Sequence, residues 1–311
     1  MSKFAPNFSR PHLTRATVAA FAVIAMSTYS SAQVDASPPN FSPSGDVGWI
    51  AAGNAFIPPP SGAGPVANDP AHPLVTGDDF RATGRQPTFP VADLSNPLLQ
   101  PWVREELRKR NERVLSGKPG FSRQASCWPI GVPGFLLYPV QPVYFIQSPK
   151  EVVMIWQADH QVRHVYLTDK HSMRVRPSWY GESIGHYEGV TLVVDTIGLD
   201  TRTFVDNFET PHSDRLHVIE RFHLIDGGKS LEVNVHVEDP IAFTMPWDAI
   251  QRYRRVEPSI SGKAPIEARS SGGTSSASEP GPMIEASCAE NNVSYFGDDA
   301  YPMPQANNPD F

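Results

Sequence analysis

Hydrophobic and polar residues alternate with a period of two through much of the chain from Pro133 onward. Alternation of this kind predicts β-strands that bury one face. The segments are spaced as in an all-β barrel or sandwich. About nine strands are expected, at residues 134–138, 143–147, 151–157, 162–168, 183–188, 191–197, 216–225, 230–238 and 249–256.

Short connections between several of these segments indicate that neighbouring strands are antiparallel. One connection is Asp226-Gly227-Gly228-Lys229, whose glycines permit the positive φ angles of a tight turn. About eight such strands can close a barrel around side chains or one small ligand. We therefore expect an all-β, antiparallel up-and-down, lipocalin-like barrel of about 8–9 strands. A two-sheet sandwich is the alternative.

The pattern differs before and after this barrel domain, which we place at residues 120–257. Residues 33–94 are rich in proline and glycine and predict an irregular arm. A single helix is expected within residues 95–119, where Asn96-Pro97 resembles a cap and Gly117 resembles a stop. Residues 258–311 read as a linker followed by a tail that Cys288 ties down.

Residues 1–32 have the features of a signal peptide, with basic residues before a short apolar stretch. Periplasmic or secreted localisation follows, although a membrane anchor is the alternative reading. No later apolar run is long enough to span a membrane. In an oxidising compartment, Cys127 and Cys288 are expected to form a disulfide worth roughly 2–4 kcal/mol. The net charge of −7 argues against a nucleic-acid partner.

Two carboxylates stand in apolar rows of the expected strands. Glu220 alternates with Leu216, Val218 and Phe222, so it is expected to face inward. An inward carboxylate is suited to acid–base catalysis, but a structural ion pair with an arginine is an equal alternative. Asp195 lies in a second apolar row, and the two carboxylates can divide acid and base roles if they share one cavity.

Histidines and aromatic residues gather around these strands. His186, His212 and His217 are candidate acid–base partners of the carboxylates, with His212 oriented by Asp206 or Asp214. The candidate substrate-binding residues are Arg163, as a clamp for a carboxylate, and Trp179, Tyr180 and His160. The two aromatic residues can equally plug one end of the barrel. No established metal-ligand spacing is present, so no cofactor is expected. A metal site assembled from His160, His186, His212 and His217 is the alternative.

Several segments together resemble a large family of uncharacterised secreted bacterial proteins. The resemblance rests on CWPIGVP at 127–133, HQVR at 160–163, SWYGESIGHYEG at 178–189, TLVVDT at 191–196, LHVIER at 216–221, PW at 246–247 and CAENN at 288–292. It implies an exported β-domain and no particular reaction. Tyr187 stands where relatives often have tryptophan, and Val190 replaces a usual acidic residue, which suggests a turn position.

These observations favour an exported, cofactor-independent enzyme that uses Glu, Asp and His side chains on a small aromatic or cyclic molecule. A lyase reaction, by decarboxylation or elimination, is slightly preferred over hydrolysis. The alternative is a periplasmic, lipocalin-like binding protein for a hydrophobic small molecule. A third reading is a partner-binding module. Convergence of Glu220, Asp195 and a histidine in one open cavity would favour the enzyme.

Overall fold

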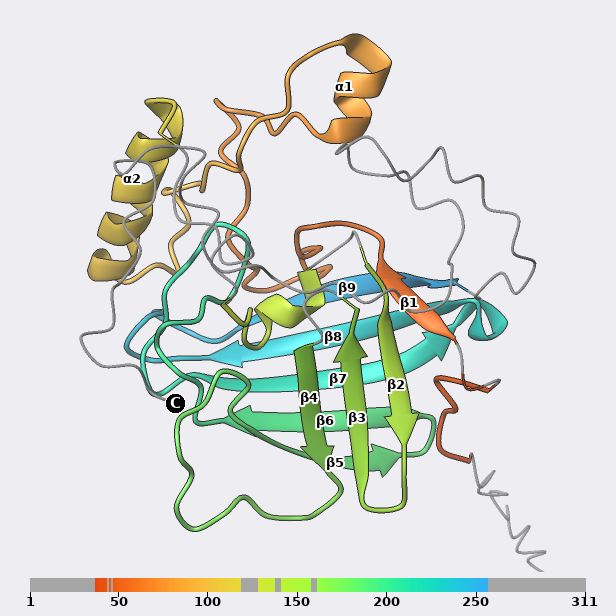
Figure 1. Ribbon diagram of the computed structural model, residues 1–311. Coiled ribbons are helices and arrows are strands. Elements are labelled where there is room, and N and C mark those ends of the chain that lie inside the picture. Colours follow the sequence, from red (N-terminus) through yellow and green to blue (C-terminus); the bar gives the residue numbers. More distant parts are fainter. Residues whose placement is uncertain are drawn as a thin grey trace, which may run out of the picture. The chain divides into compact units, whose positions relative to one another are not determined.

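The computed structural model describes residues 37–43, 45, 47–118, 128–137, 141–157 and 161–256. Within these ranges nine strands close a barrel in which neighbours along the chain are neighbours in the sheet (Figure 1). The strands are β1 (Gly48–Ala51), β2 (Val143–Gln147), β3 (Glu151–Trp156), β4 (Gln161–Tyr166), β5 (Glu182–Glu188), β6 (Thr191–Ile197), β7 (His217–Ile225), β8 (Ser230–Glu238) and β9 (Trp247–Val256). The expected all-β barrel is confirmed.

One junction of the barrel is parallel. β4 and β5 run in the same direction and are joined by only two residue pairs, Val165 with Ser183 and Tyr166 with Ile184. Every other pair of neighbouring strands is antiparallel. The expectation of a purely antiparallel barrel is therefore wrong at this junction. The cause is the long connection at residues 167–181, which returns the chain so that β5 repeats the direction of β4.

The strand that closes the barrel comes from the arm that was expected to be irregular. β1 pairs with β2 on one side and with β9 on the other, and all four of its residues are buried. Trp49 is 1% exposed, and its indole N–H donates to the carbonyl oxygen of Phe41 at 2.9 Å. The strand expected at residues 134–138 is instead a 3₁₀ helix, Gly134–Leu137, with residue 138 outside the described ranges. β1 shows no alternation because both of its faces are covered.

The two α-helices precede the main run of strands. α1 (Gly77–Thr83), which the sequence reading missed, begins with a capping box between Thr76 and Asp79. α2 (Pro101–Leu115) begins later than expected, because Pro101 and not Pro97 occupies its first turn. The Trp102 indole donates to the carbonyl oxygen of Ile241 at 2.7 Å, which holds α2 against the β8–β9 connection.

The inward-facing side chains of the strands form one continuous hydrophobic core. On β8, Leu231, Val233, Val235 and Val237 are at most 1% exposed, and Phe222 of β7 is equally buried. Each such side chain stabilises the fold by roughly 1.5–3 kcal/mol relative to an exposed one. The interior of the barrel is thus packed with side chains along these strands. A ligand site is therefore expected on the outer surface of the barrel.

Several expectations lie outside the described residues. They are the signal peptide at 1–32, the disulfide between Cys127 and Cys288, the substrate-binding role of His160 and the tail at 258–311. Among the residues that are described, no helix has the length and hydropathy required to cross a bilayer.

Candidate functional site

Glu220 forms a buried ion pair inside the barrel. Its side chain and that of Arg163 are both 0% exposed, and Arg163 Nη1 donates to Glu220 Oε1 at 3.0 Å. A second contact joins Arg163 Nη2 to Glu220 Oε2. Of the two readings that the sequence left open for Glu220, this is the structural ion pair. Arg163, expected to clamp a substrate carboxylate, is enclosed by the core and engaged with Glu220.

The Arg163 guanidinium also connects strands that the backbone joins weakly. It donates to Ser183 of β5 at 3.2 and 3.3 Å and to Thr196 of β6 at 3.0 Å, in addition to Glu220 of β7. These bonds span the parallel β4–β5 junction, where the ladder has only two residue pairs. Arginine is suited to this position because its planar group presents five donors in a fixed arrangement.

Asp195 and Glu220 lie on opposite faces of the sheet. Glu220 pairs in register with Val194, whereas Asp195 pairs with Ile219. The Asp195 side chain is 38% exposed and the Glu220 side chain is fully buried. The condition under which the two carboxylates could divide acid and base roles, a shared cavity, is therefore not met. Val193 and Ile197 give the outward row of β6 the appearance of an inward one.

On the outer face, Asp195 joins two histidines. His217 Nε2 lies 2.9 Å from Asp195 Oδ1, and His171 Nε2 lies 3.1 Å from the same oxygen. The other nitrogen of His171 lies 3.0 Å from Glu182 Oε1. His171 comes from the β4–β5 connection and Glu182 from the start of β5. The structure therefore brings together two of the expected catalytic residues, Asp195 and His217, and adds two others.

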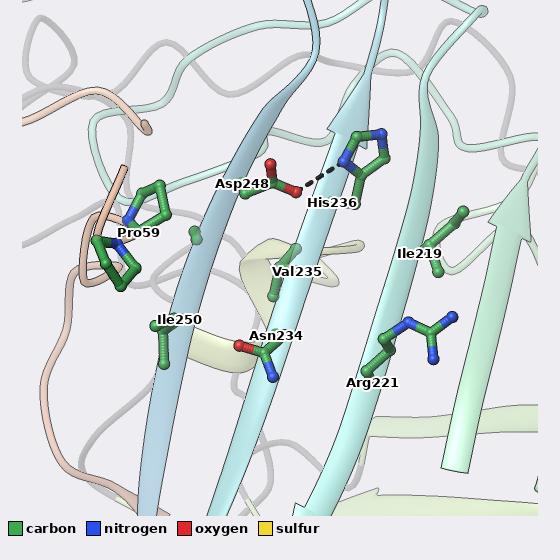
Figure 2. A pocket seen from close by; sticks show the side chains of 10 residues that line it. Pro59, Ile219, Arg221, Asn234, Val235, His236, Asp248 and Ile250 are labelled. Atoms are coloured by element: carbon green, nitrogen blue, oxygen red, sulfur yellow. Dashed lines mark hydrogen bonds and ion pairs between the residues drawn. The ribbon is translucent and has the colours of Figure 1, made fainter. Parts of the chain in front are cut away.

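The contacts continue from His217 across β8 to β9. His217 Nδ1 lies 3.6 Å from Glu238 Oε2, and His236 Nε2 lies 3.0 Å from Glu238 Oε1. His236 Nδ1 lies 2.7 Å from Asp248 Oδ1, the contact drawn in Figure 2. Carboxylates and imidazoles thus alternate across five strands. We call this set the outer-face chain; its members are Glu182, His171, Asp195, His217, Glu238, His236 and Asp248.

The contacts of the outer-face chain change the protonation of its members. Burial lowers the pKa of His236, but the hydrogen bonds to Glu238 and Asp248 outweigh it, so the pKa is raised above its ordinary value. The hydrogen bond from His236 lowers the pKa of Glu238. The pKa of Glu182 is also lowered, chiefly by a hydrogen bond from Ser172. His236 consequently carries more imidazolium near neutral pH than a free histidine does, which is the state that a general acid requires.

A pocket lies on the outer face of β7, β8 and β9, at the end of the outer-face chain that carries His236 and Asp248 (Figure 2). Its volume is about 430 Å³. Its floor consists of two rows of three side chains that pair in register across the strands. One row is Arg221, Asn234 and Ile250, and the other is Ile219, His236 and Asp248. Pro59 and Pro60 of the N-terminal arm form a wall beside β9.

Two other expected catalytic residues lie apart from the outer-face chain. His212 is 3% exposed, and its two nitrogens lie 2.8 Å from Thr203 Oγ1 and 2.8 Å from the carbonyl oxygen of Ser213. Thr203 and Ser213, and not the expected Asp206 or Asp214, orient this ring, and burial lowers its pKa. His186 is exposed, with Nε2 3.1 Å from Glu188 Oε1.

The two expected aromatic residues are half-buried in contacts with other side chains. Trp179 lies 5.4 Å from Trp128 between ring centroids, and the Arg202 guanidinium carbon lies 4.3 Å from the Trp179 centroid. The Tyr180 ring meets Phe135 edge-on at 5.8 Å, and its hydroxyl bonds to Gln161. Because both rings are engaged within the protein, they fit the alternative reading as packing groups better than a free platform.

The sequence reading missed the functional candidates His171, Glu182, Glu238, His236 and Asp248. His236 lies in the outward row of β8, which alternation alone predicts to face solvent. A signal exists, since His217 pairs in register with Glu238 and His236 pairs with Asp248. Reading that signal requires the strand register, which alternation within one strand does not provide.

Neither a metal-binding arrangement nor a known relative indicates the chemistry of this site. In the described part of the chain, no three ligating side chains are arranged to hold a metal ion. Comparison of the sequence and the structure with protein-family models, curated proteins and solved structures gave no match.

Proposed function

We propose that this protein is an exported, cofactor-independent enzyme that transfers protons on a small cyclic molecule at the outer-face pocket. The observation that carries the proposal is His236, which borders the pocket and is held by carboxylates at both ring nitrogens, 2.7 Å from Asp248 and 3.0 Å from Glu238. In known enzymes a carboxylate orients one ring nitrogen of the catalytic histidine while the other nitrogen faces the reacting group. In this proposal one of the two carboxylates orients His236, and the substrate displaces the other from the nitrogen that transfers the proton. The signal peptide expected from the sequence supports a periplasmic or secreted location.

The remaining members of the outer-face chain can restore the proton that His236 gives up. Glu238, His217 and Asp195 follow His236 at separations of 3.0, 3.6 and 2.9 Å. These groups are partly exposed, so they exchange protons with solvent. In this proposal Glu220 has no catalytic role, because its ion pair with Arg163 is enclosed by the core.

A lyase reaction is preferred over hydrolysis. Elimination and decarboxylation of an acid require one group that holds the carboxylate or its neighbour and another that moves a proton. Arg221 and His236 lie in different rows of the same pocket and suit these two tasks. Hydrolysis requires similar proton transfers and also a positioned water molecule.

The test is a turnover screen with matched histidine variants. The mature protein is incubated with a library of cyclic acids, esters and lactones, and conversion is followed by mass spectrometry. We expect wild type to convert at least one compound and His236→Gln to lower that rate by about 10²–10⁴-fold. The control is His223→Gln, because His223 also points outward from β7 but lies 3.4 Å from Glu232, away from the pocket lining. Full turnover by a folded His236→Gln protein would sink the proposal.

The alternative function is binding of a hydrophobic small molecule without conversion. The apolar part of the same pocket, made of Ile219, Ile250, Pro59 and Pro60, favours it. Because the barrel interior is packed with side chains, this alternative places the ligand on the outer face and not inside the barrel as in a lipocalin. Saturable binding of library compounds with no conversion of any of them would support this alternative.

A further inference from the structure

We propose that the outer-face pocket recognises a small ring that carries a carboxylate at one end and a proton-exchanging substituent, such as a hydroxyl, at the other. The carboxylate is held by Arg221 and Asn234, and the opposite substituent faces His236. The identity of the reacting end rests on the proposed function, whereas recognition of the carboxylate does not.

The strand register fixes the distance between the two ends. Arg221 pairs with Asn234, and Ile219 pairs with His236, two residues further along each strand. Two residues along a strand correspond to about 7 Å, and residues directly opposite are about 5 Å apart. One six-membered ring with substituents at opposite ends bridges the longer of these distances. Both polar corners are therefore within reach of a single small ligand.

The first corner offers donors for a carboxylate. Arg221 donates one Nη1–H to Glu188 at 2.6 Å, and its remaining guanidinium donors form no other hydrogen bond within the described residues. The Asn234 amide likewise forms no side-chain hydrogen bond to any described residue, although it lies at the centre of the pocket floor (Figure 2). Figure 2 shows the Arg221 guanidinium turned toward the β6 side of β7, where Glu188 of β5 holds it, and the Asn234 amide turned toward β9. A carboxylate bound between these two paired residues meets both groups once the exposed Arg221 side chain turns from Glu188 toward β8.

The wall of the pocket is suited to a flat apolar ring. Ile57 and Ile250 exchange backbone hydrogen bonds of 2.8 and 2.9 Å, and the Asp248 amide donates to the carbonyl oxygen of Ala63 at 3.1 Å. These bonds hold both ends of the segment that carries Pro59 and Pro60. Because proline has a fixed φ, this wall is largely formed before a ligand arrives. The volume of about 430 Å³ lies within the range of small-molecule sites.

The second corner accounts for the far end of the ligand. His236 is oriented by Asp248 at 2.7 Å and stands in the row beyond Asn234. Both ring nitrogens of His236 already contact carboxylates, so a hydroxyl placed there donates to the Asp248 carboxylate beside the imidazole, without displacing the ligand carboxylate from Arg221. The pocket therefore distinguishes ligands by the charge at one end and by hydrogen bonding at the other.

Isothermal titration calorimetry with three probes tests the proposal. The mature protein is titrated at pH 7 with 4-hydroxybenzoate, with 4-hydroxybenzyl alcohol, which lacks the carboxylate, and with 4-hydroxybenzylamine, which carries the opposite charge. We expect the acid to bind at least tenfold more tightly than the alcohol and the amine, because hydrogen bonds to charged groups are the stronger ones. Equal affinity for the acid and the amine overturns the proposal. So does the absence of detectable binding of the acid at about 10 mM, a concentration at which even a weak site would be occupied.

Arginine variants locate the binding. Arg221→Met is expected to weaken 4-hydroxybenzoate binding by about 10–100-fold. The matched control is Arg252→Met, since Arg252 points outward from β9 and is also held by one carboxylate, with Nε 2.7 Å from Glu232, but does not line the pocket. We expect this control to stay within twofold of wild type. Equal losses in both variants would show a general effect of surface charge and refute the assigned site.

The two proposals fail in different ways. His236→Gln is expected to change 4-hydroxybenzoate affinity by less than about threefold, because the carboxylate end supplies most of the recognition. If the acid binds as described but no compound is converted, the proposed function fails and the recognition of a ring carboxylate stands. If conversion depends on His236 but ring carboxylates bind no better than the alcohol, this inference fails alone.

Discussion

Removing either partner of the Arg163–Glu220 pair is expected to destabilise the barrel strongly. The two side chains are fully buried, with Arg163 Nη1 3.0 Å from Glu220 Oε1. Arg163→Met leaves the Glu220 carboxylate without its counter-ion in the core, and Glu220→Leu leaves the guanidinium without its counter-ion. The double variant Arg163→Met with Glu220→Leu removes both charges and keeps similar volume.

The expected cost follows from the burial of the pair. Breaking a buried ion pair by removing one partner costs about 3–5 kcal/mol, because an uncompensated charge remains in the core. The loss of bonds from Arg163 to Ser183 and Thr196 adds to the cost of Arg163→Met. In a domain of this size each kcal/mol corresponds to about 2–4 °C, so Tm should fall by about 6–20 °C. The double variant should lie within about 2 kcal/mol of wild type, since apolar replacements of buried pairs are often tolerated.

Urea denaturation followed by tryptophan fluorescence measures the four proteins of this double-mutant cycle. Hydrogen exchange at Val165 and Tyr166 reports separately on the parallel β4–β5 junction, where we expect Arg163→Met to speed exchange most. A coupling energy near zero, or single variants within about 1 kcal/mol of wild type, would refute the assignment of Arg163 as the residue that reinforces the β4–β5 junction.

Three further predictions concern pH and backbone geometry. Burial lowers the pKa of His212 below 6.5, so its contribution to stability is complete above that pH and is lost as pH falls. The free energy of unfolding measured in urea should therefore decline toward pH 5, and His212→Gln should reduce that decline. For His236 the pH dependence of stability has the opposite sign, because its raised pKa gives a contribution to stability that is complete below pH 6.5 and is lost as pH rises through the folded-state value. His236→Gln should remove this loss, which we expect to be roughly 0.2–1 kcal/mol. An unchanged pH profile of the free energy of unfolding would contradict the ion pairs. Gly181→Ala should cost at least about 1–3 kcal/mol by calorimetry, since φ is +63° and a Cβ would lie 2.4 Å from the Ile197 carbonyl oxygen, whereas Gly53→Ala has open space and should change little; similar Tm values for both would contradict the strain.

Much of the barrel is legible in the sequence. β2, β6 and β8 begin and end where the alternation predicts them, and the inward residues of β7 are the expected ones. This succeeded because the period of two is a property of a single strand with one buried face. β1 escaped detection because its four residues are buried on both sides and carry no alternation.

The candidate site was legible only in part. The sequence points to Asp195 as a carboxylate in an apolar row and to His217 as a histidine on the neighbouring strand, and the structure places the two side chains 2.9 Å apart. Glu220 was also selected, but its inward position serves a buried ion pair. The contribution of His171 had no local signal, because it lies in the long β4–β5 connection and reaches Asp195 only after folding.

The sequence by itself determined eight of the nine strands, β2 to β9, and which side chains within each of them share a face. It did not reveal β1, and it predicted a strand where Gly134–Leu137 forms a 3₁₀ helix. Tertiary structure decided the closure of the barrel through the pairing of Gly48 with Val256, the parallel direction of β5, and the face of β6 that carries Asp195. The reason is that alternation depends on neighbours along the chain, whereas register, direction and closure depend on contacts between residues far apart in the sequence. The outer-face chain belongs to this second kind of information, since its members come from five strands and one connection and become neighbours only in the folded barrel.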